Sequence, residues 1–587
     1  MKRWFIKYIR PHIVSFIVGP LCMIVEVVGE IMMPWLLRGV LNAGSAGTLT
    51  VGSCIGYMVA MILTALLMMA GGVGGAYFGT RASVGFSADL RLDLYKKVQS
   101  YSFANIDRFS SGSLVTRLTN DVTQLQNFIN MLLRMCLRAP GMMIGALIMA
   151  VALRPDLSLV FCVSIPVLFI AILFIVRRGF PRFKVVQERI DTLNSTVEES
   201  VTNVRVVKSF VREDHEEEKF RGANGALRRA GMAAYKIMIG IQPVMTICMN
   251  LTTVAVLWIG GRIVMREAGT VGGMQVGDLS SFVTYVTQIL SSLMMVTMMF
   301  MMSSRAMASA RRISEVLDEL PDISGEGAAQ PELRVEHGDV EFRDVSFRYY
   351  KGSSAEVLSH INLHIKAGST VGIIGSTGCG KTTLVSLIPR LYDTDSGEVL
   401  VDGVNVRDYS LYHLREGVGM VLQKNVLFSG TIAENLRWGN ADASDEEMLE
   451  ASRAAEADKF VSSFPEGYET VLGQGGANVS GGQKQRLCIA RALLKKPKII
   501  ILDDSTSAVD TATEARIREA FATSLAGTTK IIIAQRISSV RECDNIIVFG
   551  DGEIVGEGTH DELMSSCEDY RDIVRSQSGS AEKEARA

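Results

Sequence analysis

Apolar residues are concentrated in six long stretches in the first half of the chain. Four of these stretches contain no charged residue: Gly39–Thr80, Leu157–Val176, Ile237–Gly261 and Leu279–Ser304. Two more, roughly residues 13–37 and 128–153, carry a few charges but are otherwise as apolar. A helix needs about 20 apolar residues to cross a bilayer. The pattern therefore predicts six membrane-spanning helices, which a water-soluble helical protein would not need.

The second half of the chain has a different pattern. Short β-branched runs such as residues 369–376 and 530–536 alternate with helical segments, which indicates an α/β domain on a mainly parallel sheet. A stretch rich in proline, glycine and acids separates the halves and is typical of a linker. The predicted division is a membrane domain with two long loops (1–318), a linker (319–338), the α/β domain (339–575) and a disordered tail (576–587).

Lysine and arginine counts set the orientation, because cytoplasmic loops carry the excess of basic residues. The loop 81–121 holds six such residues and the loop 177–236 holds thirteen, whereas the loops between the other spans hold one or two. The N-terminus, both long loops and the α/β domain should therefore face the cytoplasm. We expect a multi-pass protein of the cell membrane, the inner membrane of a bacterium.

Composition narrows the function further. The formal net charge is −2, so no overall basic field attracts nucleic acid, and none is expected as a partner. The nine cysteines include no CxxC pair, which argues against a zinc site or a disulfide framework. No small-residue cleavage site follows a short apolar core, so no cleavable signal peptide is expected.

The segment GSTGCGKT, residues 375–382, fits the phosphate-loop pattern GxxxxGK[ST] after an apolar strand and before a helical segment. Its backbone amides can surround phosphate oxygens, Lys381 can reach the terminal phosphates and Thr382 can hold Mg²⁺. Asp503 ends a second apolar strand and suits another Mg²⁺ contact. ATP and Mg²⁺ are thus the expected cofactors. The residues expected to hold the nucleotide here are Gly375, Ser376, Thr377, Gly378, Cys379, Gly380, Lys381, Thr382 and Thr383.

Further motifs resemble those of ATP-binding-cassette (ABC) ATPases, over residues 339–575. The signature is Ser480, Gly481, Gly482 and Gln483. Tyr349 resembles the aromatic residue that stacks on adenine, and Gln423 resembles the switch glutamine, which also contacts Mg²⁺. Residues 507–510, Ser-Ala-Val-Asp, resemble the loop that touches the opposite subunit.

The membrane half extends this resemblance, since residues 111–122 and 199–213 are similar to cytoplasmic-loop motifs of ABC exporters. The usual acid of the first motif is replaced by Ser113. Six spans and one cassette match an exporter half-transporter. The resemblance implies that two chains exchange helices in the bilayer and enclose two ATP molecules. Each ATP then lies between one chain's phosphate loop and the other chain's signature.

Two positions depart from the family pattern. The catalytic glutamate is replaced by Asp504, and the switch histidine by Gln535. With Gln423, these are the candidate catalytic residues. Because both changes affect one ATP site, we interpret the chain as the weakly hydrolysing subunit of a heterodimeric exporter. Its partner should carry Glu and His at the two positions. The alternative is a homodimeric lipid or drug flippase.

Two other classes of function compete with transport. A soluble cassette protein of DNA repair or translation would not need six spans. A channel or sensor that uses ATP only for gating is not distinguished from an exporter by the residues alone. Drugs, lipids, peptides and metabolites all remain open as substrates.

Charged and methionine residues occur within the predicted spans. Glu26 and Glu30 lie one turn apart in the first span, and Arg134 and Arg138 one turn apart in the third. Counting about 1.5 Å per residue from the predicted ends places the acids high and the bases low in the bilayer, so they should not pair. The glutamates either form a site for cationic cargo or make hydrogen bonds within the bundle. The sixth span is rich in methionine, which suits either an adaptable pocket or a lipid-facing surface: Met294, Met295, Met298, Met299, Met301 and Met302.

Overall fold

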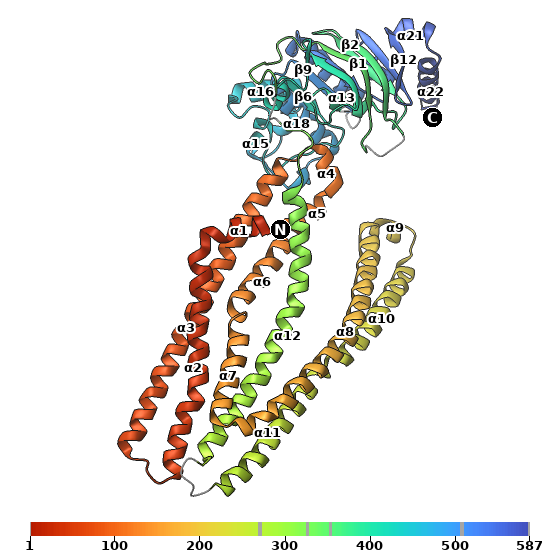
Figure 1. Ribbon diagram of the computed structural model, residues 1–587. Helices are drawn as coiled ribbons and strands as arrows, with labels where there is room; N and C mark the ends of the chain where they lie inside the picture. Colours follow the sequence, from red (N-terminus) through yellow and green to blue (C-terminus); the bar gives the residue numbers. More distant parts are fainter. Residues whose placement is uncertain (1, 268–272, 325–327, 351–354, 505–509, 585–587) are drawn as a thin grey trace. The chain divides into compact units, whose positions relative to one another are not determined.

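The computed structural model describes residues 2–267, 273–324, 328–350, 355–504 and 510–584 (Figure 1). The chain divides into two compact units. The membrane unit contains residues 1–98 and 112–319, and the cassette unit contains residues 99–111 and 320–587. The last division, between Glu319 and Leu320, lies one residue from the boundary proposed at residues 318/319. The short segment 99–111, which the sequence assigned to the membrane domain, joins the cassette unit instead.

Among the described residues, six helices are long and apolar enough to cross a membrane, as predicted: Phe5–Ser45, Val51–Gln99, Ser111–Leu153, Pro155–Thr202, Glu213–Arg266 and Val276–Thr297. Several of these comprise more than one helical segment. The α-helices up to residue 318 are α1 (Lys2–Ile9), α2 (Ile13–Ser45), α3 (Val51–Gln99), α4 (Phe103–Phe109), α5 (Ser111–Thr116), α6 (Val122–Met135), α7 (Arg138–Leu153), α8 (Pro155–Thr202), α9 (Val204–Ser209), α10 (Glu213–Met238), α11 (Ile241–Arg266) and α12 (Val276–Asp318).

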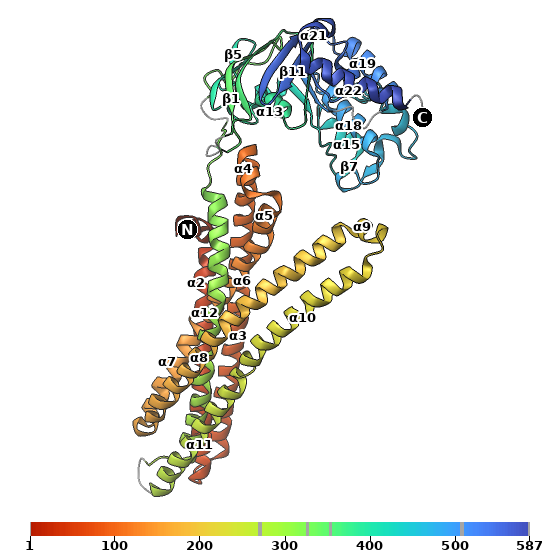
Figure 2. The same cartoon turned by 90° about the vertical axis from the view of Figure 1, so that its right-hand side faces the viewer.

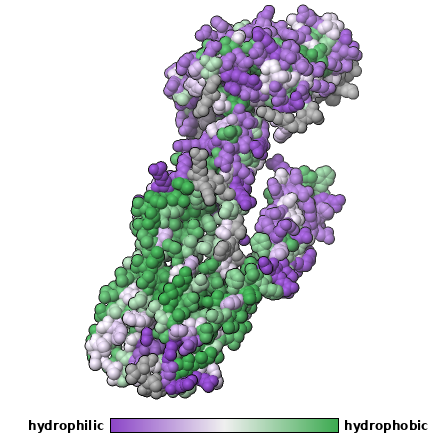
Figure 3. Space-filling model, in the orientation of Figure 1, coloured by the Kyte–Doolittle hydropathy of each residue, from purple (hydrophilic) through white to green (hydrophobic). Residues whose placement is uncertain are grey.

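The outer surface of the membrane unit is apolar. Ile55, Ile62 and Leu66 of α3 are each more than half exposed. Figure 3 shows a mostly hydrophobic surface over the spanning helices and a hydrophilic one over the far ends of α8 and α10. Such a large exposed apolar surface is unfavourable in water and suits contact with lipid tails.

The interior of the bundle is held together where α12 lies against α2. Pro34 has no backbone N–H and therefore leaves the carbonyl of Glu30, one turn earlier, without its helical partner. The Nε2 atom of Gln288 donates to that carbonyl at 3.0 Å, and the hydroxyl of Tyr285 donates to the carbonyl of Ile31 at 3.1 Å. Side chains of α12 thus satisfy α2 backbone groups that lipid could not.

Helices α8 and α10 lie side by side and are joined through α9 (Figures 1 and 2). α8 alone has 48 residues, a length of about 72 Å at 1.5 Å per residue, which is far more than a bilayer requires. Most of the predicted loop 177–236 is therefore helical, as a continuation of the neighbouring spans. Their charged ends belong to the predicted cytoplasmic loop 177–236.

The charges within the bundle pair, so the prediction that they would not is wrong. An Arg138 Nη atom of α7 lies 2.9 Å from Glu26 Oε1 and the other lies 3.3 Å from Glu30 Oε2. The error came from taking the start of α2 as the membrane surface, because this helix has 33 residues and spans about 50 Å. Counted from the other ends of their helices, Glu30 and Arg138 are each 15 residues from the last residue.

The cassette unit contains a six-stranded sheet in the order β12-β11-β3-β10-β9-β6. All its strand pairs are parallel except β11–β12, which confirms the predicted mainly parallel sheet. An antiparallel sheet, β2-β1-β4-β5, and the pair β7-β8 were not predicted. The strands are β1 (Val340–Phe347), β2 (Leu358–Ile365), β3 (Thr370–Gly375), β4 (Ser396–Val401), β5 (Val404–Asn405), β6 (Val418–Val421), β7 (Gly430–Thr431), β8 (Val471–Leu472), β9 (Ile499–Asp503), β10 (Thr529–Ile533), β11 (Asn545–Gly550) and β12 (Glu553–Gly558).

Ten helices of the described residues follow or flank these strands. They are α13 (Lys381–Leu387), α14 (Leu411–Gly417), α15 (Ile432–Arg437), α16 (Asp445–Ala454), α17 (Asp458–Val461), α18 (Gly481–Leu494), α19 (Thr511–Ser524), α20 (Ile537–Val540), α21 (His560–Ser566) and α22 (Glu568–Glu584). α22 continues to Glu584, within the tail 576–587 whose disorder stays a prediction, and residues 585–587 lie outside the described residues. Its first turns bury apolar side chains on the cassette, which the polar composition of the tail does not reveal.

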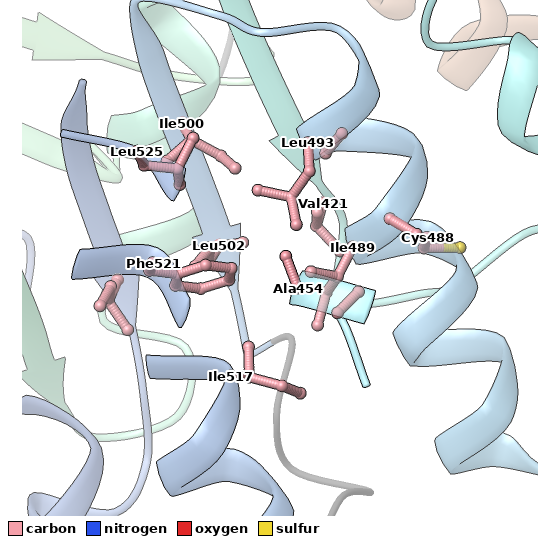
Figure 4. Packing of buried hydrophobic residues seen from close by; sticks show 14 of the residues in the cluster. Val421, Ala454, Cys488, Ile489, Leu493, Ile500, Leu502, Ile517, Phe521 and Leu525 are labelled. Carbon is pink, nitrogen blue, oxygen red and sulfur yellow. The ribbon is translucent and has the colours of Figure 1, made fainter. Parts of the chain in front are cut away.

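A hydrophobic core fixes strand β9 beneath the candidate site. Ile500 and Leu502 of β9 are buried and pack with Leu493 of α18 and Phe521 of α19 (Figure 4). A strand buried on both faces needs a continuous apolar run, which explains the isoleucines of β9. The rigid strand ends at Asp503 and so holds that carboxylate in place.

Candidate nucleotide-binding site

The phosphate loop connects β3 to α13. Gly378 and Gly380 adopt φ values of 89° and 106°, which glycine reaches without the steric cost of a Cβ atom. A Cβ on Gly380 would also lie 2.9 Å from the carbonyl oxygen of Val357. These two glycines therefore allow the chain to curl tightly at the start of α13. The resulting turn presents backbone amides in the manner that phosphate binding requires.

Lys381 is buried and folded over this loop. Its Nζ atom donates to the carbonyl oxygens of Gly375 at 2.9 Å and Ser376 at 2.6 Å. The ammonium group is thus held inside the curve of the loop, between residues 375 and 380. From there it can redirect its hydrogen bonds to the oxygens of a bound phosphate chain, as the sequence predicts.

Thr382 and Asp503, predicted as Mg²⁺ ligands, are in contact although 121 residues separate them. The Thr382 hydroxyl donates to Asp503 Oδ2 at 2.9 Å. Burial is the main cause that raises the pKa of Asp503, and the neighbouring carboxylate of Asp504 adds to it. A hydroxyl and a carboxylate oxygen are hard ligands of the kind that Mg²⁺ prefers. The donor set fits that ion beside the phosphate loop.

The two residues that depart from the family pattern also meet. The Nε2 atom of Gln535 donates to Asp504 Oδ2 at 3.1 Å, and the Gln423 side chain hydrogen-bonds to Asp504 as well. Burial raises the pKa of the Asp504 carboxyl. The three candidate catalytic residues therefore form one cluster next to Asp503.

One member of this site has no counterpart in the sequence prediction. Gln485 of α18 is buried, and its Nε2 atom donates to the backbone carbonyl of Asp504 at 3.1 Å. It lies two residues beyond the signature, so the signature helix is tied to the catalytic strand of its own chain. Only the tertiary fold reveals this role, because the bond is made to a backbone atom.

The signature residues themselves begin α18. Ser480 caps the helix: its hydroxyl accepts from the backbone N–H of Gln483, whose side chain accepts from the backbone N–H of Ser480. Ser480 and Gly481 are exposed. Within the described part of the chain, no recorded hydrogen bond or ion pair joins Ser480, Gly481 or Gly482 to the phosphate loop. This exposure fits the predicted contact with a partner's nucleotide. Residues 507–509 of the predicted subunit-contact loop lie outside the described residues.

Tyr349, the predicted adenine-stacking residue, is anchored to the phosphate-loop helix. Its hydroxyl shares a hydrogen bond of 2.8 Å with the hydroxyl of Thr383. The ring is partly exposed and meets the ring of Tyr392 edge-on, with centroids 5.2 Å apart. An exposed aromatic face beside the phosphate loop is suitable for a base, but its role stays a prediction.

Tyr392 also contacts helix α4. Its hydroxyl donates to Asp107 Oδ2 at 2.8 Å, and its ring lies 6.1 Å from that of Phe103. The side chain of Asn105 donates to the carbonyl of Leu320 at 3.2 Å. The segment contributed by the first cytoplasmic loop is therefore joined to the cassette next to Tyr349.

The membrane unit has a separate pocket of about 370 Å³ between α11 and α12. Among the predicted methionines of the sixth span, Met294 and Met295 line it, while the side chains of Met298 and Met301 lie outside the described residues. Glu26 and Glu30 are not among its lining residues. Those residues are Gln242, Met245, Thr246, Met249, Asn250, Ser291, Met294 and Met295.

Comparison with known proteins agrees with this architecture. Residues 16–314 match the ABC transporter transmembrane region, and residues 358–507 match the ABC transporter family of ATPases. The uncharacterized ABC transporter ATP-binding protein YfiB of Bacillus subtilis (strain 168) is 38% identical over 584 residues, covering 98% of each chain. A fatty acid ABC transporter ATP-binding/permease protein of Mycobacterium tuberculosis is 36% identical over 486 residues, covering 83% of this chain and 75% of that protein.

Among solved structures, a bacterial Atm1-family ABC exporter with ATP bound has a similar fold. The TM-score is 0.78 with 24% identity, over 97% of this chain and 98% of that one. The likeness extends over the spans and the cassette together. From the family match over both halves and the full-length relative at 38% identity, we conclude that this chain belongs to the ABC transporter family, as an exporter half-transporter with one membrane domain and one ATP-binding cassette.

Proposed function

We propose that this half-transporter is one subunit of a heterodimeric exporter and holds its weakly hydrolysing ATP site. The observation that carries the proposal is the contact between Asp504 and Gln535, the two residues that depart from the family pattern. The family works as dimers in a lipid bilayer and couples ATP hydrolysis to transport. The proposal concerns which subunits form the dimer and which site hydrolyses.

The residues of this chain suit retention of ATP. Lys381 and the loop glycines can bind the phosphates, and Thr382 with Asp503 can hold Mg²⁺, which neutralises phosphate charge when bound. Asp504 is shorter than the family's glutamate by one methylene, so its carboxylate ends about 1.5 Å farther from water placed for a glutamate. A general base must lie within hydrogen-bond reach of the proton it takes.

Gln535 removes a second group that hydrolysis uses, the switch histidine of the family, which can carry a positive charge. A glutamine can donate a hydrogen bond, as it does to Asp504 at 3.1 Å, but it cannot carry the positive charge of an imidazolium. The site therefore keeps polar contacts while losing a charged group. We infer that this site closes around ATP and releases it slowly.

The proposed partner is a homologous half-transporter with glutamate and histidine at the positions of Asp504 and Gln535. In a head-to-tail dimer, the exposed Ser480 and Gly481 of this chain would cover the partner's ATP, where a full catalytic set is expected. One polypeptide then contributes an intact signature to the active site and an impaired set to the other.

For the cargo, we propose a small or amphipathic molecule taken up through the pocket between α11 and α12. The lining combines four thioether side chains with carboxamide and hydroxyl groups and contains no ionisable side chain. Flexible methionines adapt to different shapes, which favours a range of related cargoes.

The test compares substitutions in the co-expressed pair by steady-state ATPase activity. Gly481→Asp introduces bulk and charge at the partner's ATP and should remove most turnover. Asp504→Asn should have a much smaller effect, because its own site contributes little hydrolysis. If both substitutions prove equally damaging, Asp504 is a working base and the asymmetric arrangement is wrong.

A second measurement uses the chain alone in lipid nanodiscs. Two copies would place Asp504 and Gln535 in both sites, and loss of a well-placed general base lowers rates by about 10²–10⁴-fold. We expect turnover that much slower than for the pair. Rapid hydrolysis by the isolated chain would instead favour the homodimeric flippase.

A further inference from the structure

The side chain of Gln577, in helix α22, binds the backbone on both sides of Arg536. Its Nε2 atom donates to the carbonyl oxygen of Gln535 at 2.7 Å, and its Oε1 atom accepts from the backbone N–H of Ile537 at 2.9 Å. A single carboxamide thus satisfies a carbonyl and an amide two residues apart. The segment that it holds is the one that carries Gln535 of the nucleotide site.

The position of Gln577 is fixed by the packing of α22. Tyr570 is fully buried, and Ile573 and Val574 pack against the hydrophobic core of the cassette. The Tyr570 hydroxyl hydrogen-bonds to Nδ1 of His560 at 2.7 Å, which joins α22 to α21. Positions 570, 573, 574 and 577 recur at helical spacing and share one face, so this packing places the Gln577 side chain against the segment.

The segment has little support of its own. Helix α20 has only four residues, and the side chain of its N-cap residue, Arg536, makes no capping hydrogen bond. The first amides of a helix have no partner within it. Gln577 supplies the acceptor for Ile537 from another helix and so replaces the missing cap.

The segment also lies where the terminal phosphate of a nucleotide is expected. β10 lies between β3, which leads into the phosphate loop, and β9, which ends at Asp503. Gln535 follows the carboxyl end of β10 by two residues and donates to Asp504 at 3.1 Å. A shift of the backbone at Gln535 would therefore move a side chain that faces this end of the site.

We propose that Gln577 is a positioning residue of the nucleotide site. It fixes the backbone on both sides of Arg536, and thereby holds the Gln535 carboxamide within reach of Asp504 and of the terminal phosphate of ATP. The C-terminal helix is in this way part of the ATP site, although it contributes no atom to the phosphate loop. This role does not depend on which subunit of the dimer hydrolyses faster.

The test measures nucleotide release from the full-length chain in lipid nanodiscs with EDTA in place of Mg²⁺, so that no hydrolysis occurs, using the fluorescent analogues mant-ATP and mant-ADP. Gln577→Ala should speed mant-ATP release about three- to tenfold, the factor expected when a neutral hydrogen bond is lost. Release of mant-ADP, which has no terminal phosphate for Gln535 to reach, should not change. Arg575→Ala is the matched control, since that side chain is exposed and pairs with Asp572 on the same helix.

Two further variants test the route of the effect. In the Gln535→Ala background, Gln577→Ala should add nothing, because Gln577 acts through Gln535. Gln577→Glu keeps the acceptor for Ile537 but turns a carboxylate towards the Gln535 carbonyl, so it should speed mant-ATP release while the cassette stays folded. This variant is decisive if Gln577→Ala does not fold.

Three results would overturn the proposal. If Gln577→Ala speeds the release of mant-ATP and mant-ADP equally, the substitution loosens the cassette as a whole. If the effects of Gln577→Ala and Gln535→Ala add, Gln577 does not act through Gln535. If Gln577→Glu leaves mant-ATP release unchanged, Gln577 has no role at the site. Because release is measured without turnover, these results are independent of the heterodimer proposal, which rests on hydrolysis rates.

Discussion

Asp504 adopts a left-handed backbone conformation, with φ at 47°. Its backbone N–H donates to the carbonyl of Ile533 at 2.9 Å, which holds this turn against β10. Left-handed backbone costs most residues about 1–2 kcal/mol, and short polar residues such as aspartate tolerate it better than others. The turn directs the Asp504 carboxylate toward Gln423 and Gln535 rather than along the strand.

This arrangement suggests that hydrolysis can be recovered at this site. Asp504→Glu with Gln535→His would restore both the reach of the base and the charged switch residue. We expect ATPase activity of the chain alone in nanodiscs to rise about 10–100-fold, the lower range of general-base effects. Asp504→Glu alone should give a smaller increase. No increase in the double variant would mean that these residues do not limit hydrolysis.

The pKa values of Asp503 and Asp504 predict opposite pH effects on binding and on stability. Burial raises both above the ordinary 3.8, so these carboxyls bind protons at a pH where an exposed aspartate is ionised. Mg²⁺ must displace the proton of Asp503, so Mg²⁺-dependent ATP binding should weaken as the pH falls towards this window. The protonated, neutral form of these carboxyls is favoured in the buried site. Their contribution to the free energy of unfolding is therefore fully present below pH 3.8, the pKa of an unfolded aspartate, and is lost as the pH rises through the raised pKa values.

Thermal unfolding between pH 4 and pH 6, with and without Mg²⁺ and ATP, measures both effects. Stabilisation by the ligands should shrink toward pH 4. Asp503→Asn should make that stabilisation small and nearly independent of pH. Ligand stabilisation that stays constant down to pH 4 in the unsubstituted protein would contradict the argument.

At this scale, the sequence predicted the residues whose chemistry is local. The phosphate loop and the Asp503 contact depend on short motifs with fixed spacing, and Thr382 lies against Asp503 as expected. Gln485 and Gln577 were not predicted, because each binds backbone atoms of a distant segment. A glutamine in a helix carries no signal of such a bond.

At the scale of elements, the charge cluster between α2 and α7 links two spans. Arg138 pairs with Glu26 and Glu30, and all three side chains are less than one-third exposed. Removing one partner of a buried ion pair leaves a charge without compensation and costs about 3–5 kcal/mol. Here the loss of Arg138 would leave two carboxylates facing each other.

We therefore expect Arg138→Met to lower the thermal stability of the membrane unit in nanodiscs, by about 3 kcal/mol in free energy of unfolding. Adding Glu26→Gln and Glu30→Gln should recover most of that loss, because the remaining groups are neutral. Arg134→Met, one turn away and exposed, is the control and should have little effect. If the triple variant is no more stable than Arg138→Met, Arg138 does not stabilise the unit by compensating the charges of Glu26 and Glu30.

The sequence located the spans but not their contacts. Composition alone identified all six, since an apolar run has few alternatives. The pairing of Arg138 depended on how far α2 extends beyond the bilayer, and an apolar run does not show where a helix ends. The antiparallel sheet β2-β1-β4-β5 was likewise missed, because the alternation along a strand such as β2 does not show which strands it pairs with.

At the scale of the whole molecule, the bond between Tyr392 and Asp107 joins a cytoplasmic-loop helix to the cassette. Tyr392→Phe removes only the hydroxyl, and loss of that bond should let α4 open more often. We expect hydrogen–deuterium exchange of residues 103–109 to rise about two- to tenfold, as for one net hydrogen bond. Tyr412→Phe, at an exposed ring, is the control. Unchanged exchange in Tyr392→Phe would mean that ring packing alone holds α4.

The two compact units of the chain are separated at more than one place in the sequence. One division lies between Glu319 and Leu320, where the composition changes. Composition did not assign segment 99–111 to the cassette, because the segment lies between two spans and is too short to show a change of composition. Its membership in the cassette follows from the contacts of Asn105 and Asp107.

The discontinuous cassette has a consequence for biosynthesis. Segment 99–111 leaves the ribosome about 200 residues before the next part of its unit, which begins at Leu320. At a synthesis rate of about 5–20 residues per second, α4 waits roughly 10–40 seconds for the first residue of the cassette, and longer for Tyr392. During that interval Phe103 has no ring from Tyr392 to pack against. Docking of α4 is therefore a late event in maturation, and the new cassette must bind a helix whose flanking spans were synthesised well before it.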